Sequence, residues 1–355
     1  MDTRENTCLE EVPGDVLVDI FCRLPMKTLV QCRGVCKEWQ DLLSSPIFVS
    51  FHLSRSVTAL ATGVSPDCLF FEHLSREDNV MVTKLGMEFD FNGAASLNGL
   101  ICSWNYREKR VSVSNPIIGK RITLPESQKE YGISHFKPML RIGISPETGL
   151  YKVLKIQPRR ESRSKTKWAA EICTLGVGAV TWRNIADVPQ KFLFCTTLDG
   201  TFFNGAFHFI FTRDSPEFND YICSFDFDNE KFQSNLEQPS PPLDNEECPE
   251  WLGLGVLTDC LSVSNIYGLG NGNPDIEVWV MKEYGVTKSW TKVFALENPM
   301  ETLSSPSGFK IIKFLETIGI HSRFFALLYV PSFVWLEDVE VGESSREIEQ
   351  CLSEL

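Results

Sequence analysis

Residues 9–43 read LEEVPGDVLVDIFCRLPMKTLVQCRGVCKEWQDLL. Pro13, Gly14 and Asp15 form a helix-entry signal, because proline tolerates the first helical turn and an aspartate can cap its free amides. Apolar residues then recur at helical spacing, at Val16, Leu17, Ile20, Phe21 and Leu24. Because Pro25 cannot continue a helix, the stretch predicts a short amphipathic helix that ends before it.

Two further short helices are predicted downstream of Pro25. Leu29 lies in the second, and the third carries Val35, Cys36, Trp39, Leu42 and Leu43. Three helices of this length cannot bury so much apolar surface among themselves, so the unit needs a partner surface. That surface is either another protein or the rest of this chain, and in the second case the helices are an ordinary N-terminal cap.

The same stretch resembles the F-box family, and VCKEWQDLLSSPIF (35–48) is similar to the plant form of its motif. The matching positions are Leu9, Pro13, Asp15, Ile20, Leu24, Pro25, Leu29, Arg33, Val35, Cys36, Lys37, Trp39, Leu42, Ser44, Ser45, Pro46 and Phe48. Val12 stands where a leucine usually precedes the proline, and Gln31 stands where the plant pattern often has arginine. Neither departure removes an apolar contact.

This resemblance implies that the helical unit binds a Skp-type adaptor, which links it to a cullin-RING ubiquitin ligase. The residues expected to form the adaptor interface or to support it are Pro13, Leu17, Ile20, Leu24, Pro25, Leu29, Val35 and Trp39.

From about Ser96 onward the pattern changes to short apolar runs separated by Gly, Asn-Pro, Asp and Ser turns, which is typical of β-strands. Strands are predicted near 68–71, 99–104, 111–115, 121–125, 139–144, 150–156, 171–176, 181–185, 205–211, 221–227, 231–235, 254–259, 260–267, 276–284, 290–296, 309–315 and 323–330. Strands this short and this numerous indicate a sandwich, a barrel or a propeller.

A weak internal echo favours the propeller over a two-sheet sandwich with a subdomain. SLNGLICSWN (96–105), TTLDGTFFNGAFHFIF (196–211) and LGVLTDCLSVSNI (254–266) each place a polar turn before an apolar strand. At roughly 45 residues for a four-stranded blade, this region has room for five or six blades.

The β region also resembles plant F-box-associated domains over about 96–296. VSNPIIGKRITLP, GISPETGLYKVLKI, EICTLGVGAVTWRNI, YICSFDFDNEKF and IEVWVMKEYGVTKSWTK carry this resemblance. It implies a mainly β fold, a three-helix F-box followed by a β-propeller-like domain that recruits a target protein. The predicted organisation is an F-box at 5–50, a linker with first strands at 51–95, the β domain at 96–336 and an acidic tail at 337–355.

Charge and cysteine content limit the partners and the compartment. The net charge of −13 opposes general nucleic-acid binding, which needs a positive footprint. No secretory signal or membrane-spanning apolar run is present, so no membrane partner is expected. The 12 cysteines lack regular spacing, which fits a reducing cytoplasmic and/or nuclear compartment.

No catalytic, cofactor-binding or metal-binding residue is predicted, because the sequence carries no recognised nucleophile, zinc or phosphate-loop motif. His208 is expected to be a packed or rim histidine rather than a base, and GLGNGN (268–273) is expected to be a hairpin turn. Asp226 and Asp228 could pair as acid and base, or could simply shape a strand end. The chain is therefore expected to be a non-enzymatic receptor, the alternative being an adaptor-independent propeller protein or propeller enzyme with a vestigial F-box.

One segment is strongly basic within this acidic chain. KIQPRRESRSKTK (155–167) carries six basic residues and one acidic residue. It is either a solvated hairpin insertion or a contact for an acidic target or a nuclear-import receptor.

Overall fold

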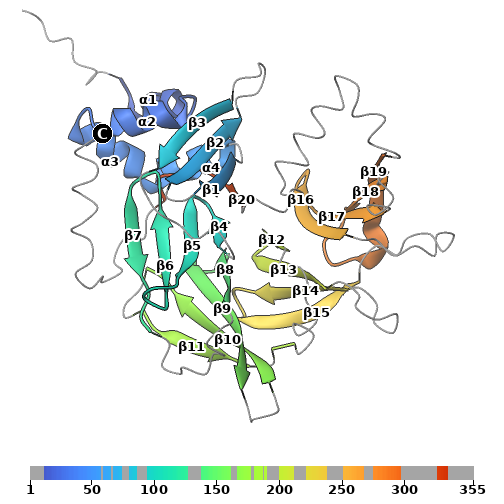
Figure 1. Ribbon diagram of the computed structural model, residues 1–355. Coiled ribbons are helices and arrows are strands. Elements are labelled where there is room, and N and C mark those ends of the chain that lie inside the picture. Colours follow the sequence, from blue (N-terminus) through green and yellow to red (C-terminus); the bar gives the residue numbers. More distant parts are fainter. Residues whose placement is uncertain are drawn as a thin grey trace, which may run out of the picture.

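Figure 1 shows the computed structural model of the chain. The structure describes residues 12–56, 59–64, 67–73, 80–85, 94–126, 137–160, 166–176, 180–186, 188–189, 200–211, 221–237, 251–267, 275–296 and 326–334. The predicted strand at 309–315, the GLGNGN turn and the acidic tail lie outside the described residues.

Four α-helices precede the strands, where the sequence predicted three. They are α1 (Gly14–Phe21), α2 (Met26–Arg33), α3 (Lys37–Ser44) and α4 (Pro46–Arg55). The fourth helix begins with a capping signal that the prediction overlooked: the Ser45 hydroxyl accepts a hydrogen bond from the Phe48 amide at 3.2 Å, and Pro46 occupies the first helical turn. In the part of the chain described, none of these helices is long and apolar enough to cross a membrane.

The predicted cap of α1 was wrong. Pro13 is the N-cap residue and Asp15 lies inside the first turn, where its side chain makes no capping hydrogen bond. An acidic side chain in that turn still faces the positive end of the helix dipole. Pro25 does not directly end α1, which stops at Phe21; it is the N-cap of α2.

The described strands form five antiparallel sheets of four strands each. The first sheet has the order β20-β1-β2-β3, with β1 (Ala59–Val64), β2 (Asp67–His73), β3 (Val80–Leu85) and β20 (Ala326–Tyr329). The second has β4 (Ala95–Leu97), β5 (Leu100–Asn105), β6 (Arg110–Asn115) and β7 (Lys120–Thr123). The third has β8 (Met139–Ile144), β9 (Tyr151–Arg160), β10 (Thr166–Thr174) and β11 (Trp182–Ile185).

The fourth sheet has β12 (Gly200–Phe203), β13 (Ala206–Phe211), β14 (Tyr221–Asp226) and β15 (Lys231–Glu237). The fifth has β16 (Trp251–Leu257), β17 (Cys260–Tyr267), β18 (Asp275–Met281) and β19 (Trp290–Leu296), with a short 3₁₀ turn η4 at Thr287–Ser289. The predicted strand near 68–71 is confirmed by β2, and the predicted strand at 323–330 contains β20.

Sheets two to five are each built from consecutive strands, and neighbouring sheets touch through their first or second strands. Contacts join β20 to β4, β4 and β5 to β8, β8 to β13, and β12 and β13 to β16. In the first sheet the corresponding position beside β4 is occupied by β20, a strand from the far C-terminal part of the chain. Figure 1 shows how the sheets follow one another around this series of contacts.

The echo in the sequence corresponds to one recurring hairpin. Asn98-Gly99 joins β4 to β5, and Asn204-Gly205 joins β12 to β13, with positive φ at all four residues. Thr258 and Asp259 occupy the equivalent turn between β16 and β17, also with positive φ. Two residues in this conformation make the tight turn that suits the twist of an antiparallel pair.

Apolar clusters fill the spaces between neighbouring sheets. Val113 of the second sheet packs in one cluster with Val153 of the third, and Leu154 of the third packs in another with Phe225 of the fourth. Ile222 of the fourth sheet packs with Leu261 of the fifth. Successive residues of one strand, such as Val153 and Leu154, thus face different neighbouring sheets, as the two-residue period of a strand requires.

The sheets have two distinct ends. At the near end lie the turns 98–99, 116–119, 145–150, 204–205, 227–230, 258–259 and 282–289. Asn98 Nδ2 donates to Tyr151 Oη at 3.1 Å, and the Glu147 amide donates to Asp228 Oδ1 at 3.1 Å, so turns of neighbouring sheets meet there. The opposite, far end carries the β5–β6 turn at 106–109 and is the end at which the chain leaves one of these sheets for the next.

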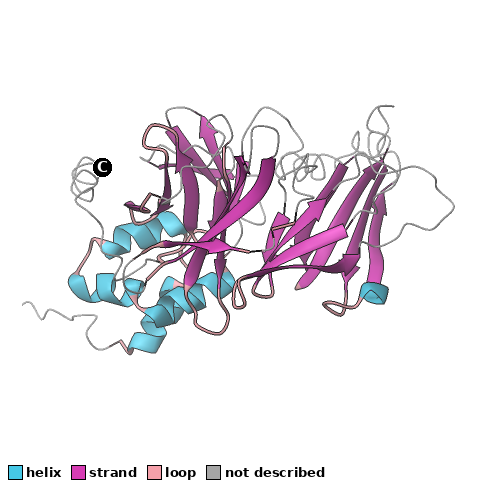
Figure 2. Cartoon of the chain, turned by 90° about the horizontal axis from the view of Figure 1, so that it is seen from below, coloured by secondary structure: helices cyan, strands magenta, loops and turns pink. Residues whose placement is uncertain are grey.

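The helices lie at the near end. Ile117 and Ile118 of the β6–β7 turn pack in one cluster with residues of the helices. Figure 2 shows the helices gathered at one end of the strands.

Candidate functional site: the exposed apolar face of the helices

The helices α1–α4, called here the helical unit, have a small core of their own. Its buried members are Val18, Phe21, Met26, Leu29, Leu43 and Phe48. The rings of Phe21 and Trp39 meet edge to face with centroids 4.9 Å apart, which ties α1 to α3. This core settles which of the predicted apolar residues point inward.

The apolar arc of α1 is too wide to be covered by that core. Val18 and Phe21 are buried, whereas Val16 and Ile20, which are four residues apart, are 43% and 45% exposed. Residues at i and i+4 share one face of a helix, so these two side chains form a solvent-facing apolar edge. An exposed apolar edge on a small unit is the feature expected of a docking surface.

The structure divides the eight residues predicted for the adaptor interface. Pro13, Ile20, Pro25 and Val35 are exposed, and Val35 is 64% exposed in the link between α2 and α3. Leu17, Leu24 and Trp39 are half-buried against the core. Leu29 is fully buried. Four of the eight are thus free to be contacts, and Leu29 supports the helices from within.

Four further exposed apolar residues of the helical unit were not among the predicted contacts: Val16, Val30, and Ile47 and Phe51 of α4. Val16 belongs to the stripe described above, and Val30 of α2 is 42% exposed. The exposure of Val30 could not be predicted, because α2 is mostly polar and its apolar residues do not form a clear stripe. Val16, Ile20, Val30 and Val35, with Pro13 and Pro25, are called here the apolar face.

An ion-pair group holds α1 against α4 beside this face. Asp19 accepts from Arg55 at 2.8 Å and from Arg23 at 2.8 Å. The Arg55 hydrogen bond, followed by that from Arg23, lowers the pKa of Asp19 below its usual value. All three side chains are solvent-exposed, so the group orients the helices more than it stabilises them.

Residues 332–334, called here the clamp, attach the helical unit to the sheets. Phe333 is 4% exposed and packs in the core of the helical unit, with its ring centroid 6.1 Å from those of Phe48 and His52. Val334 instead packs in the cluster between the second and third sheets. Adjacent residues thus enter two different cores, so the orientation of the helices is fixed relative to the sheets.

Buried hydrogen bonds hold the clamp in place. Asn115 Nδ2, at the end of β6, donates to the carbonyls of Ser332 at 2.9 Å and Val334 at 2.7 Å. The Ser332 hydroxyl donates to the Asn98 carbonyl at 2.5 Å. Gly99 follows with φ of +83°, and a side chain there would collide with Ser332. The Asn115 side-chain amide and the Asn98 carbonyl thus both have hydrogen-bond partners in the clamp. A different position of the clamp would leave these groups without those partners.

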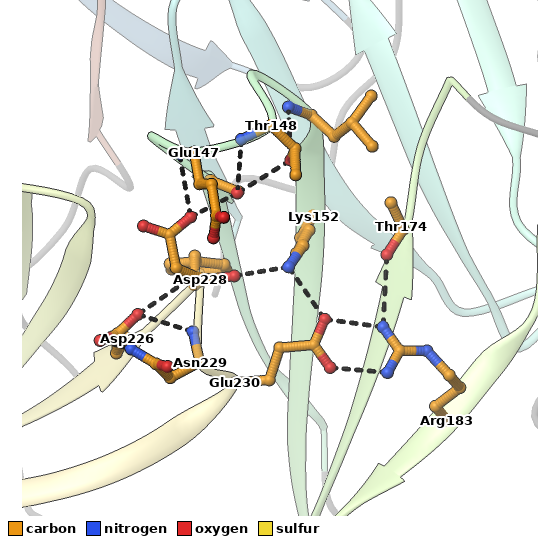
Figure 3. A network of polar contacts seen from close by, with 12 residues as sticks. Glu147, Thr148, Lys152, Thr174, Arg183, Asp226, Asp228, Asn229 and Glu230 are labelled. Atoms are coloured by element: carbon orange, nitrogen blue, oxygen red, sulfur yellow. Dashed lines mark hydrogen bonds and ion pairs between the residues drawn. The ribbon is translucent and has the colours of Figure 1, made fainter.

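The carboxylates considered for chemistry belong to a structural network (Figure 3). Asp226 accepts from the amides of Asp228 at 2.8 Å and Asn229 at 3.0 Å. Asp228 accepts from the Ser145 hydroxyl and the Glu147 amide in the β8–β9 turn. Asp226 thus shapes the β14–β15 turn within the fourth sheet, and Asp228 joins that turn to the third sheet. This geometry favours the structural alternative over an acid–base pair.

The same network contains an ion pair between sheets. Lys152 Nζ contacts the Phe227 carbonyl at 2.5 Å and Glu230 at 2.9 Å, while Arg183 forms a two-pronged contact with Glu230 at 2.6 and 2.7 Å. Burial alone would raise the pKa of Glu230, but hydrogen bonds from Arg183 and Lys152 lower it overall. The network joins the fourth sheet to the third.

His208 is buried between the fourth and fifth sheets. Its Nε2 lies 2.8 Å from Tyr284 Oη, and burial lowers its pKa to about 4, so it is neutral near pH 7. This matches the packed histidine predicted from its aromatic strand. Within the described residues, no cluster of three or more His, Cys, Asp or Glu side chains has the arrangement of a metal site.

The predicted basic segment 155–167 is only partly a surface feature. Lys155 is buried in β9 and pairs with Glu171 at 2.8 Å, so its assignment to a basic loop was wrong. Arg160 and Lys167 are exposed and Arg159 is half-buried, at the far end of β9 and β10. Residues 161–165 lie outside the described residues.

Comparison with known proteins identifies both parts of the chain. Residues 9–55 match the F-box-like family profile, and residues 59–318 match the profile of the F-box associated beta propeller domain. The F-box protein At3g07870 of Arabidopsis thaliana is 29% identical over 81% of this chain and 73% of its own length. The F-box protein CPR1 of the same plant is 27% identical over 96% of this chain and 86% of its own length.

A third Arabidopsis relative, the F-box/kelch-repeat protein At3g23880, is 26% identical over 83% of this chain and 82% of its own length. The solved structure of TolB from Acinetobacter baumannii covers 72% of this chain and 59% of TolB at a TM-score of 0.37 and 10% identity. The matched profiles and the plant relatives lead to one conclusion: this chain belongs to the plant F-box proteins that carry an F-box associated domain.

Proposed function

We propose that the chain is the substrate-recognition subunit of a Skp-cullin-F-box ubiquitin ligase. The observation that carries this proposal is the apolar face, which the helices expose although they have a core of their own. The family relationship supplies the partner class: a Skp-type adaptor, and through it a cullin.

The chemistry of the apolar face suits such a contact. Val16, Ile20, Val30 and Val35 are each more than 40% exposed, and their burial by a partner removes apolar surface from water. Aliphatic side chains and two prolines offer a firm surface that loses little conformational entropy on binding. Leu29, which is buried, and Trp39, which is half-buried, pack beneath the apolar face and hold the helices together. In this proposal the exposed residues contact the adaptor and these two support the exposed residues from within.

The β domain is proposed to form a propeller that binds the target protein. Neighbouring sheets meet through their first or second strands, and β20 completes the first sheet from the C-terminal side, which suits the radial repetition of four-stranded sheets in a propeller. The helical unit occupies the near end. The far end is therefore the side left for a target.

The proposed mechanism is positioning without covalent chemistry. The clamp fixes the helical unit relative to the sheets, so an adaptor on the apolar face and a target on the far end would be held in one geometry. Holding a lysine of the target near a loaded conjugating enzyme raises its effective concentration. In this role the chain is a non-enzymatic receptor that acts in the cytoplasm or nucleus.

The test is a binding assay of the purified full chain with a plant Skp-type adaptor. Ile20→Asp and Val35→Asp place a charge on the apolar face at exposed positions, so the fold is retained and adaptor binding is expected to fall by at least tenfold. Leu24, which is half-buried, is a poorer probe because a charge there also disturbs the core.

Ile47→Asp is the matched control. Ile47 of α4 is 66% exposed and lies in the same helical unit but outside the apolar face, so this variant is expected to bind like the parent. An equal loss in all three variants would move the interface onto α4. No binding by the well-folded parent would contradict the receptor role and would favour an adaptor-independent binding protein.

A further inference from the structure

One stripe of helix α2 carries two cations beside the apolar face. Lys27, Val30 and Arg33, called here the α2 stripe, follow one another at three-residue spacing, so each is a surface neighbour of the next on the helix. Lys27 and Val30 are exposed, and Arg33 is half-buried. The stripe therefore places one residue of the apolar face between two positive charges.

Arg33 is the less solvated of the two cations. Its guanidinium carbon lies 5.8 Å from the centroid of the Phe333 ring, and its buried Nε has no hydrogen-bond partner. Burial lowers the pKa of Arg33, whereas a hydrogen bond to Asp19 raises that of Arg55. Within the described residues, neither Arg33 nor Lys27 forms an ion pair. A partly desolvated cation is stabilised by an anion, so this site favours an acidic ligand.

The other cations of the helical unit already have acidic partners. Arg23 and Arg55 both pair with Asp19. A hydrogen bond from its own backbone amide is the main cause that lowers the pKa of Glu38, and the charge of the adjacent Lys37 adds to it. In the described part of the helical unit, cations without an acidic partner are thus confined to the α2 stripe.

The clamp places the start of an acidic segment near this stripe. Residues 337–341 read EDVEV and begin three positions after Val334. The Val334 carbonyl is held by Asn115, and the preceding residue, Phe333, is the one that the Arg33 guanidinium approaches. Three residues of chain span at most roughly 10 Å, so the acidic segment begins within reach of that guanidinium.

The length and composition of 337–341 suit the α2 stripe. Lys27 lies about 9 Å from Arg33 along the helix axis, since each helical residue adds about 1.5 Å. Five residues of chain span up to roughly 16 Å, so the segment is long enough to reach both cations. Its three carboxylates complement the two positive charges, and its two valines complement Val30 between them.

We propose that the acidic segment 337–341 docks on the α2 stripe of its own chain and covers Val30, so that the segment and the adaptor compete for the helical unit. This inference rests on the proposed function, because Val30 belongs to the proposed adaptor contact. The segment is favoured over a separate acidic protein because the clamp tethers it nearby, which gives it a high effective concentration. The apparent adaptor affinity then falls with the fraction of chains in which the stripe is covered.

Carbodiimide cross-linking of the purified full chain tests the docking without an adaptor. The reagent joins an amine directly to a carboxylate, so it reports groups that are in contact. Lys27 is expected to couple to Glu337, Asp338 or Glu340 within the monomer, as identified by mass spectrometry. Lys288, which is exposed in the β18–β19 turn of the fifth sheet, is the control and is expected not to couple to them.

Adaptor binding by the full chain tests the competition. The segment variant neutralises the carboxylates of the segment: Glu337→Gln, Asp338→Asn and Glu340→Gln. The matched control neutralises three carboxylates farther along the tail: Glu347→Gln, Glu349→Gln and Glu354→Gln. The segment variant is expected to bind the adaptor about threefold to tenfold more tightly than the parent at low salt, by a margin that shrinks as salt is raised. The matched control is expected to bind like the parent.

Several results would overturn the proposal. Absence of the Lys27 cross-link, its appearance only in dimers, or equal coupling of Lys288 would each exclude docking within one chain. Equal adaptor affinities of the parent and the segment variant would exclude competition, and an equal gain in the matched control would show a general effect of net charge instead. If the Lys27 cross-link formed but no variant bound the adaptor, the proposed function would be contradicted and the docking of the segment would be supported.

Discussion

Phe333→Ala tests whether the clamp holds the helical unit. The ring is 4% exposed, packs near Phe48 and His52, and has the Arg33 guanidinium 5.8 Å from its centroid. Truncating a buried phenylalanine costs about 3–5 kcal/mol through lost transfer energy and the cavity left behind. A value near 4 kcal/mol is expected here, because the ring contacts several helices and the cation–π contact is lost with it.

The assay is amide hydrogen exchange resolved along the chain. A loss of about 4 kcal/mol corresponds to roughly thousandfold faster exchange in the helices, since each 1.4 kcal/mol is tenfold. Among the described residues, those of the fifth sheet and Phe333 lie in different clusters, so the amides of the fifth sheet are expected to keep their protection. Adaptor binding is expected to weaken along with the loss of exchange protection in the helices.

Phe51→Ala is the matched control for this substitution. Phe51 is an aromatic residue of the same helical unit, but it is 52% exposed, so its truncation should change stability by about 0.5 kcal/mol or less. If Phe333→Ala and Phe51→Ala had similar effects, the packing argument for the clamp would be refuted. Equal loss of protection in the helices and the fifth sheet would show instead that the chain unfolds as one unit.

Three further predictions concern the sheets and the clamp. Gly143→Ala places a methyl group against the buried ring of Phe227 and is expected to lower the free energy of unfolding by about 1–3 kcal/mol, measured by urea denaturation. Glu230→Gln is expected to cost roughly 2–3 kcal/mol at pH 7, because it leaves Lys152 with a weaker partner. The pKa of Glu230 is lowered in the folded protein, so the contribution of this carboxylate to stability is fully present above the unfolded pKa of 4.5 and is lost as the pH falls through the folded pKa. The free energies of unfolding of the parent and the variant should therefore converge in acid. A difference that stayed constant with pH would contradict this. Asn115→Ala leaves two buried carbonyls without their donor and is expected to cost about 2–4 kcal/mol and to speed exchange in the helices; unchanged exchange would show that these hydrogen bonds do not hold the clamp.

The helical unit shows which structural features a local sequence pattern can predict and which it cannot. The stripe in 16–24 predicted α1, because helical spacing of apolar residues depends only on nearby sequence. It did not separate Ile20, which is exposed, from Phe21, which is buried, because that choice depends on where α3 packs. For α4 a local signal was available in Ser45 and Pro46, but it was not read as a helix start.

The sheets show the same limit at longer range. Most strands were predicted near their observed positions, since each follows from a short apolar run between turns. The pairing of β20 with β1 could not be predicted, because it joins residues that are distant in sequence and no local pattern specifies the partner. Lys155 was misplaced for a related reason: only the register of β9 against β10 shows that Glu171 lies opposite it.

The clamp also has a consequence for synthesis of the protein. The ribosome makes the helices before residues 326–334, yet until those residues have emerged the core of the helices lacks Phe333 and the first sheet lacks β20. Because domains fold as units and long-range contacts form late, the helices should reach their final packing only after residues 326–334 have left the ribosome. A prematurely terminated chain would then present an unfinished helical unit, which would limit its competition with intact receptors for the shared adaptor.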